Sequence, residues 1–586
     1  MRKVKNMEPR SVSFDIESED IMSQTSEGRL VKILIRLAFI CFVIFVGYEI
    51  YSKMIVKTGG LGYDDAFHSL RGLLIYDDLR HGDLLSVLYD SYRQVYYPPL
   101  PSLLLGVTFL ILPPSTTSAI LFSLILFLLA SIVIYIASRE LDASGGEWIA
   151  IIASLLLLTS PVLIKYAARP MLEIPGLFAL VLTILVYFRL TQKPESLKLN
   201  FLLGLGLVIT YFMKSNYGIL LMVVTLVAFL IDENFRSKQL LKRRYFYFIL
   251  PLIITFVVWF AYPPKLISTW DAMVNIAYGV KDTYSLAGLL FYPKALVKIS
   301  GSAWLFVIYL LCFVISIKFI RDKKIRYLLL IISAQMIIGE FHQTKVARHI
   351  FPVLPAFFLL TGYVAIRWWN WNRFGNRFLD DWLPRIATLG ILLFSVNLFL
   401  QSLKPVGPDI PRQFLDNIAT MTLEDESTLI ISTIRMGGIN PPFLDWQLIT
   451  DYHVMDASHS GIAMNLVWDE KAAAVIKRFD SIPPVRDLIL TVFSRADEPG
   501  QSRSLCLGQP PDAPYSLTQA DLRKYLLSMR KKWAFDNVIV ITSTRPKADY
   551  SIEFIAPALE EMGFNASSTK EYPDIKNRVD RYTFQP

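Results

Sequence analysis

The sequence predicts a polytopic α-helical membrane protein of about eleven spans, followed by a soluble α/β domain. Hydrophobic residues make up 53% of the 586-residue chain. They are concentrated in runs long enough to cross a bilayer, of which ILIRLAFICFVIFVGYEIY and AILFSLILFLLASIVIYIA are the first two. No such run occurs after Gln401. We therefore divide the chain into a tail at 1–31, a membrane domain at 32–401 and a soluble domain at 402–586.

The basic residues predict how the chain crosses the membrane. The polar tail at 1–31 is expected to be disordered, and its Lys and Arg residues favour a cytoplasmic N-terminus. Basic loops such as RSKQLLKRRY at 236–245 and KFIRDKKIR at 318–326 are expected on the same side. The net charge of +9 does not indicate a nucleic-acid partner, because the basic residues cluster in short loops between the apolar runs, as is typical of membrane proteins. The segments expected outside are 53–116, 164–170, 213–217, 262–300 and 340–349.

One apolar run decides the side on which the chain ends. PPLPSLLLGVTFLIL, from Pro98 to Leu112, is short for a full crossing and is followed by Pro113-Pro114. Runs of this length are more often interfacial or re-entrant than spanning. We interpret it as a helix on the membrane surface, which leaves the C-terminus outside.

The soluble domain at 402–586 is therefore expected to be extracytoplasmic. STLIIST at 427–433 and NVIVITST at 537–544 are typical of buried strands, and QADLRKYLLSMRKKW at 519–533 is typical of an amphipathic helix. A segment of this length is sufficient for an independent α/β domain.

Three acids are the candidate catalytic residues. Asp64 and Asp65 follow the first span directly, after GGLGY, whose glycines allow a tight turn. Glu173 begins another apolar run, and an acid at that position suggests function because its burial is costly. Both observations have simpler explanations. Loop acids are commonly solvated, and Arg169 at i−4 could merely neutralise Glu173.

Cations on the same expected face are candidates for binding an anion. Lys214 lies in YFMKSNYG, between two apolar runs, and Lys345, Arg348 and His349 lie in GEFHQTKVARHIFP together with His342. An anionic group such as a lipid phosphate would explain them, as would interfacial side chains that reach lipid headgroups. The chain has no phosphate-binding loop, dinucleotide fingerprint or zinc-protease motif, and no spacing indicates a metal site.

These features, in this order, resemble the GT-C glycosyltransferase superfamily, particularly the protein O-mannosyltransferases and the lipid A aminoarabinose transferases. The resemblance rests on YDDAFH, YYPPLPSLLLG, LEIP, MKSNYG and KVARHIFPVLP and covers roughly residues 33–366. It departs from the family in two places. The acid in LEIP is Glu173 rather than Asp, and Tyr96-Tyr97 replaces the Glu-Lys pair of the aminoarabinose transferases, so a zinc site does not carry over.

The resemblance implies an inverting transferase that moves a sugar from a polyprenyl-phosphate donor to an acceptor hydroxyl on the outer membrane face. It makes Asp64 the expected general base, with Asp65 and Glu173 holding the acceptor, a water or a divalent cation. The expected donor-phosphate ligands are Arg169, Lys214, Lys345, Arg348 and His349. Tyr96, Tyr97 and His68 are the residues expected on the acceptor side. The expected partners are the lipid-linked donor, a glycan, lipid or protein acceptor, and the bilayer. No cofactor is clearly required.

Two other functions fit part of the pattern. A transporter of a lipid-linked or anionic substrate would also place polar groups among spans, but its site should lie near the bilayer midplane. A non-catalytic scaffold would leave Asp64 and Glu173 far apart. The sequence does not name the sugar or the acceptor.

Overall fold

The computed structural model describes most of the chain. The described residues are 26–58, 60–92, 97–142, 145–232, 243–261, 284–341, 345–370, 382–405, 412–424, 427–433, 441–451, 453, 503–507, 519–543, 552–572, 574 and 577–585. The residues singled out above that fall outside these ranges are Tyr96 and His342. Helix α2 begins at Ser26, so the end of the predicted tail at 1–31 belongs to this helix, and residues 1–25 lie outside the described residues.

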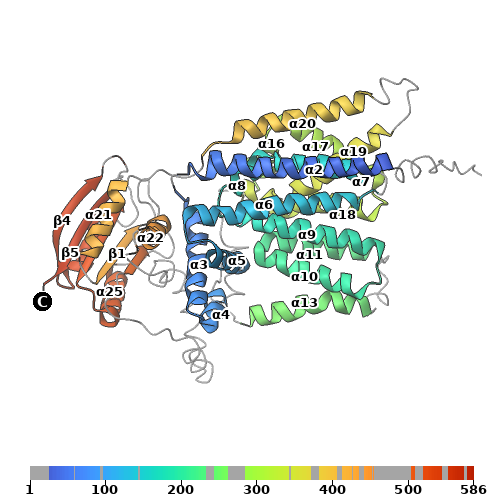
Figure 1. The fold of residues 1–586 in the computed structure, drawn as a ribbon. Helices are drawn as coiled ribbons and strands as arrows, with labels where there is room; N and C mark the ends of the chain where they lie inside the picture. The colour runs from blue at the N-terminus through green and yellow to red at the C-terminus, as the bar shows by residue number, and fades with distance from the viewer. Residues whose placement is uncertain are drawn as a thin grey trace, which may run out of the picture.

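A bundle of long helices forms the larger part of the molecule (Figure 1). The helices are α2 Ser26–Ile50, α6 Thr116–Arg139, α7 Gly146–Leu158, α8 Pro161–Ala167, α9 Glu173–Gln192, α10 Leu197–Met213, α11 Ser215–Asp232, α13 Arg243–Phe260, α15 Leu286–Leu289, α16 Phe291–Ile299, α17 Ala303–Ser316, α18 Lys323–Phe341, α19 Val353–Trp369 and α20 Leu383–Ser402. Serine residues cap the N-termini of α6, α10 and α17. The side chains of Ser115, Ser196 and Ser302 each accept a hydrogen bond from a backbone N–H in the first turn of the helix. Short π- and 3-10-helical turns are η1 Tyr51–Ile55, η2 Ile317–Phe319 and η3 Ala347–Ile350.

The bundle is that of an integral membrane protein. In the described part of the chain, six helices are long and apolar enough to cross a membrane, and up to eight spans result if each of two bent helix pairs is one span. One pair is α7 with α8, bent by 63°, and the other runs from Leu286 to Phe319 and is bent by 108°. Three shorter apolar helices are α5 (Leu100–Ile111), α10 and α19. The expected count of about eleven spans stays a prediction.

Helices α3 (Tyr63–Arg80), α4 (Leu84–Tyr92) and α5 (Leu100–Ile111) lie at one end of the bundle, and α3 runs across the direction of the spans (Figure 1). Glycines let α3 and α5 come close. A Cβ on Gly106 would lie 2.7 Å from the Ile75 side chain and 3.1 Å from the Gly72 carbonyl oxygen. This packing fixes the helix that carries Asp64. The interpretation of Pro98–Leu112 as a surface helix stays a prediction.

The C-terminal residues form a five-stranded sheet of order β2-β1-β3-β5-β4. Strands β2 (Arg503–Leu507), β1 (Thr428–Thr433) and β3 (Asn537–Ser543) are parallel, whereas β5 (Asn577–Phe584) and β4 (Phe564–Tyr572) are antiparallel. β1 and β3 are the two strands that the sequence predicted. Their runs are continuously apolar because helices cover both faces of the sheet. Leu429 packs with α25 (Gln519–Trp533) and α26 (Ile552–Glu560), and Ile430 faces α21 (Arg412–Leu423).

Helix α22 (Pro441–Thr450) joins the sheet unit to the end of the bundle. Its Trp446 is fully buried, and the indole N–H donates to the Thr116 hydroxyl at 3.1 Å. The same ring lies 5.9 Å from the Phe109 ring of α5. The sheet unit is therefore packed on the end of the bundle that carries α3 and α5.

Candidate functional site

Asp64 lies in the first turn of α3, close to the first span. Helix α3 begins after Gly62, and both Asp64 and Asp65 fall in its first turn, where the helix dipole favours a negative charge. The Asp64 Oδ2 accepts a hydrogen bond from Nη1 of Arg348 at 2.8 Å. Its side chain is 28% exposed, so this carboxylate remains accessible from outside the protein.

Asp65 has a different environment from its neighbour. Its Oδ2 accepts from the Gly62 N–H at 3.0 Å and from Nε of Arg169 at 2.8 Å, and its side chain is 3% exposed. Gly62 leaves the space for this pair, because a Cβ there would lie 2.8 Å from Nη2 of Arg169. Asp65 therefore fastens the start of α3 to the loop before α9. This contact suits a positioning role better than the catalytic role expected from the sequence.

Glu173 is the first residue of α9, and its side chain is 1% exposed. Its Oε1 accepts from Nζ of Lys214 at 2.7 Å. The alternative that Arg169 merely neutralises Glu173 is wrong, because Arg169 pairs with Asp65. Burial lowers the pKa of Lys214, and the charge of Glu173 opposes that shift.

Two residues that the sequence analysis did not select, a glycine and a tyrosine, help to build this pair. A Cβ on Gly176 would lie 2.7 Å from Cβ of Lys214, so glycine at 176 lets Lys214 come close to α9. The Lys214 ammonium also lies 5.5 Å from the centre of the Tyr217 ring. Both residues lie within a few positions of Glu173 or Lys214, but only the packing of α9 against α11 reveals their role.

Arg348 links the two halves of the site. Besides its hydrogen bond to Asp64, its Nε lies 3.6 Å from Oε1 of Glu173. A continuous chain of ionic contacts thus runs from Lys214 through Glu173 and Arg348 to Asp64. With the Asp65–Arg169 pair it forms a network of three carboxylates and three basic side chains. Asp64 and Glu173 are close together, contrary to what the scaffold alternative requires.

His68 follows Asp64 by one helical turn and is buried. Its ring packs edge-on against the Tyr97 ring, with centroids 4.7 Å apart, and Phe67 completes the aromatic group. Burial lowers the pKa of His68 to about 4, so the imidazole is neutral at physiological pH. His68 and Tyr97 are therefore near neighbours, as a shared acceptor role requires, whereas Tyr96 lies outside the described residues.

Lys345 is placed differently from the other expected phosphate ligands. Its side chain is fully buried, and its Nζ donates to Oε2 of Glu340 at 2.6 Å. The ammonium also lies 5.4 Å from the centre of the Tyr292 ring. Its closest acid is thus Glu340, not a member of the network. His349 is half-buried beside Arg348 in η3.

Comparisons with known proteins bear on the fold of this site. Residues 97–262 match the family model described as dolichyl-phosphate-mannose-protein mannosyltransferase. No curated protein sequence matches the chain. The structure is similar to that of ArnT from Cupriavidus metallidurans in the apo state, with a TM-score of 0.57 and 12% identity over 93% of this chain and 98% of ArnT. The structure of the same ArnT bound to undecaprenyl phosphate gives a TM-score of 0.55 and 13% identity over 95% and 98%. ArnT is a GT-C glycosyltransferase.

The chain has a GT-C fold. The likeness extends over both the bundle and the sheet unit, since nearly the whole of each chain is covered. The Asp64 network lies at the end of this GT-C bundle that carries α3 and α5.

The three carboxylates of the network are paired with basic side chains and do not face one another as metal ligands would. Among the described residues, no group of three His, Cys, Asp or Glu side chains is placed to hold a metal ion. Asp64, Asp65 and Glu173 each bind a guanidinium or ammonium group instead.

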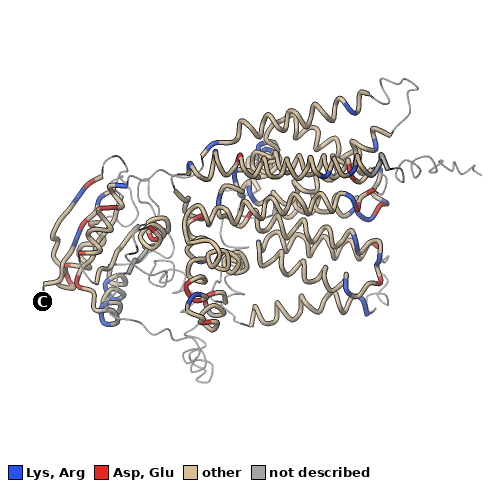
Figure 2. The backbone as a smooth tube through the Cα atoms, viewed as in Figure 1, with Lys and Arg blue, Asp and Glu red and all other residues tan. Residues whose placement is uncertain are grey.

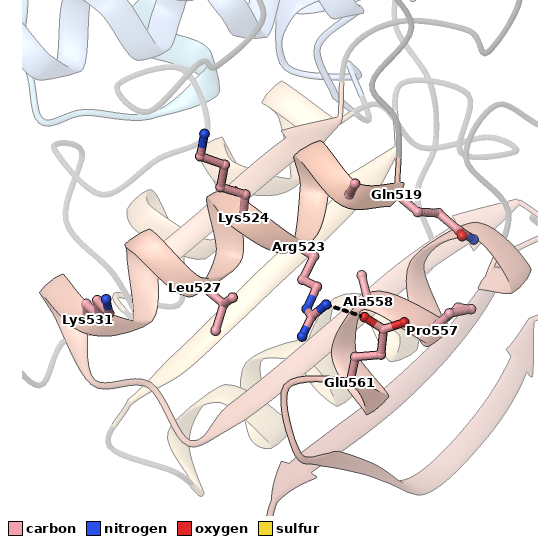
Figure 3. A pocket seen from close by; sticks show the side chains of 9 residues that line it. Gln519, Arg523, Lys524, Leu527, Lys531, Pro557, Ala558 and Glu561 are labelled. Carbon is pink, nitrogen blue, oxygen red and sulfur yellow. Dashed lines mark ion pairs between the residues drawn. The ribbon is translucent and has the colours of Figure 1, made fainter.

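A hollow of about 740 Å³ lies elsewhere in the GT-C chain, between α25 and α26 of the sheet unit (Figure 3). Arg523 pairs with Glu561 across it, at 2.8 Å. The other residues that line it are Gln519, Ala520, Lys524, Leu527, Lys531, Pro557 and Ala558. None of the predicted site residues lines this hollow, so it is not the site that the sequence indicated.

Proposed function

We propose that the protein is an inverting glycosyltransferase that moves a sugar from a polyprenyl-phosphate donor to an acceptor hydroxyl. The observation that carries the proposal is the contact between Asp64 and Arg348. It brings a partly exposed carboxylate next to a cation that suits a phosphate, at one end of an apolar bundle with a GT-C fold. The ArnT structure bound to undecaprenyl phosphate supports a lipid phosphate as the donor's carrier.

In the proposed reaction Asp64 is the general base. The acceptor hydroxyl oxygen forms a bond to C1 of the sugar as its proton passes to the Asp64 carboxylate. The bond between C1 and the phosphate oxygen breaks, its electron pair stays on the phosphate, and the configuration at C1 inverts. A positioned general base typically contributes about 10²–10⁴-fold to the rate.

Arg348 and Lys214 are the proposed ligands of the phosphate. Arg348 is partly exposed beside Asp64, and a guanidinium can form paired hydrogen bonds to a phosphate. Lys214 adds a second positive charge through the shared partner Glu173. Stabilising the charge that grows on a leaving phosphate is a large catalytic term. We propose that Arg169, Lys345 and His349 contribute positive charge from farther away. Arg169 is paired with Asp65, and Lys345 is paired with Glu340.

Residues near Asp64 are proposed to receive the acceptor. His68 and Tyr97, with Tyr96 next to them in the chain, would contact it, while Glu173 and Asp65 hold the cations and the helix start in place. We propose that the N-terminus is cytoplasmic and that the site and residues 402–586 are outside. The acceptor is a glycan, a lipid or a protein. The cations of the network supply the positive charge that a divalent ion would give, so we propose that no metal is needed.

A panel of polyprenyl-phosphate sugars, incubated with the purified full chain, tests this proposal. Release of polyprenyl phosphate from one member by the native protein, and its loss in Asp64→Asn, is the expected result. Asp77→Asn is the matched control, because it removes a carboxylate from the same helix outside the network. Full activity of Asp64→Asn would refute the base assignment, and no release from any donor would refute the function.

The transporter alternative has less support. Figure 2 shows the charged residues gathered at the two ends of the bundle, whereas its middle is largely without charge. A transporter would hold its substrate near the middle of the spans.

A further inference from the structure

The proposed base is held by another residue of the network. Nη1 of Arg348 donates to Oδ2 of Asp64 at 2.8 Å, which ties this carboxylate to a guanidinium rather than leaving it for a hydroxyl proton. The same guanidinium is the proposed ligand of the donor phosphate. Asp64 and the phosphate would therefore both bind this guanidinium.

The pairs of the network differ in how easily an incoming anion can reach them. The Lys214 and Glu173 side chains are 11% and 1% exposed, and in the second pair Arg169 is 23% and Asp65 3% exposed. Both members of the Arg348–Asp64 pair are exposed, by 29% and 28%. Arg348 is therefore the most exposed of the three basic side chains, and it is the one whose acid is also exposed.

Arg348 keeps an anchor when it leaves Asp64. Its Nε lies 3.6 Å from Oε1 of Glu173, and Glu173 is itself fixed by Lys214 at 2.7 Å. A small movement of the guanidinium can thus exchange Asp64 for a phosphate without leaving Arg348 unpaired. The three carboxylates and three basic groups carry no net charge together, so an added anion competes with the acids for the basic groups.

We infer that the donor phosphate displaces Asp64 from Arg348, so that the base is released only after the donor has bound. The inference rests on the proposed function and adds an order to it, with the lipid-linked donor first and the acceptor second. Until a phosphate has taken Arg348, an acceptor meets a carboxylate that is already engaged.

Binding of undecaprenyl phosphate to the purified full chain tests the competition without any knowledge of the sugar. If Asp64 competes with the phosphate for Arg348, Asp64→Asn should bind this lipid about tenfold more tightly than the native protein. Asp77→Asn removes the same charge from the same helix and should bind like the native protein. Equal or weaker binding by Asp64→Asn would overturn the inference.

A double-mutant cycle separates competition from simple charge repulsion. Arg348→Gln should weaken binding, and adding Asp64→Asn to it should give no gain, because the shared partner is gone. A gain that persists in the double variant would show that Asp64 only repels the phosphate, and the inference would be wrong. Absence of binding by the native protein would instead contradict the proposed donor class.

Discussion

The Arg169 guanidinium donates from Nε to Oδ2 of Asp65 at 2.8 Å, although 104 residues separate the two in the chain. The same oxygen accepts the Gly62 N–H at 3.0 Å. One buried carboxylate therefore fixes both the start of α3 and the loop before α9. Its neighbour Asp64, by contrast, makes its contact with Arg348 from a partly exposed position.

Substituting Asp65 should mainly lower the stability, whereas substituting Asp64 should mainly remove the activity. Asp65→Asn should lower the free energy of unfolding by about 3 kcal/mol, because it breaks a buried ion pair and leaves Arg169 unpaired. Asp64→Asn should lower it by about 1 kcal/mol at most, since its pair is partly solvated, yet remove transfer activity. Thermal unfolding in detergent and donor cleavage measure the two effects. Equal stability of the two variants would contradict the positioning role of Asp65.

Gly176 offers a test of the Lys214–Glu173 pair that changes neither member. Gly176→Ala should lower the stability by about 2 kcal/mol and reduce donor cleavage, because the added Cβ would lie 2.7 Å from Cβ of Lys214 and 2.9 Å from the Tyr217 ring. Gly390→Ala in α20 is the matched control, since no atom lies within 4 Å of a Cβ there. The control should retain activity and gain up to about 1 kcal/mol. If both variants behave alike, the close approach at Gly176 does not matter.

The burial of His68 should make the stability of the protein depend on pH. Burial lowers the pKa of His68 from 6.5 to about 4, so between these values the unfolded chain binds more protons than the folded one. The contribution of His68 to the free energy of unfolding is therefore fully present above pH 6.5 and decreases as the pH drops toward 4. At pH 5 the loss is about 2 kcal/mol. Melting temperatures at pH 7.5 and 5 measure this loss.

His68→Gln should reduce that acid-dependent loss, because glutamine does not titrate. His81→Gln is the control, since this histidine lies just after the same helix with an exposed side chain. The explanation fails if His68→Gln loses as much stability on acidification as the native protein.

Chelation tests the role assigned to the basic side chains. Because Arg169, Lys214 and Arg348 already hold the three acids, prolonged treatment with EDTA should leave donor cleavage unchanged. Added Mg²⁺ or Mn²⁺ should not increase it. Loss of activity on chelation, restored by one of these ions, would contradict a metal-independent site.

The sequence predicted the elements that have strong local patterns. The membrane runs, the strands of residues 428–433 and 537–543 and the amphipathic helix at 519–533 were all recognisable from their periodicity. β4 could not be recognised, because it is an edge strand whose polar residues are almost all exposed. The 63° bend between α7 and α8 was not predicted either, although Pro161, the first residue of α8, is a typical signal for a break in a helix.

The sequence analysis selected the residues that come together at the candidate site, but it did not predict which acid pairs with which basic side chain. Asp64, Glu173, Lys214 and Arg348 do come together. Their partners depend on contacts between helices far apart in the sequence, so local spacing suggested Arg169 with Glu173 and gave no partner for Lys345. The packing of α3, α9 and α11 decides these pairs, together with glycines whose importance is steric.

The burial of Trp446 against Thr116 and Phe109 has a practical consequence for work on this protein. A truncated version that ends near residue 402 would uncover the apolar surface of α3 and α5 on which α22 rests. Such a truncation would aggregate even in detergent, because the micelle covers the spans and not this outer surface. The sheet unit produced alone would carry the complementary exposed tryptophan, so both pieces must be expressed as one chain.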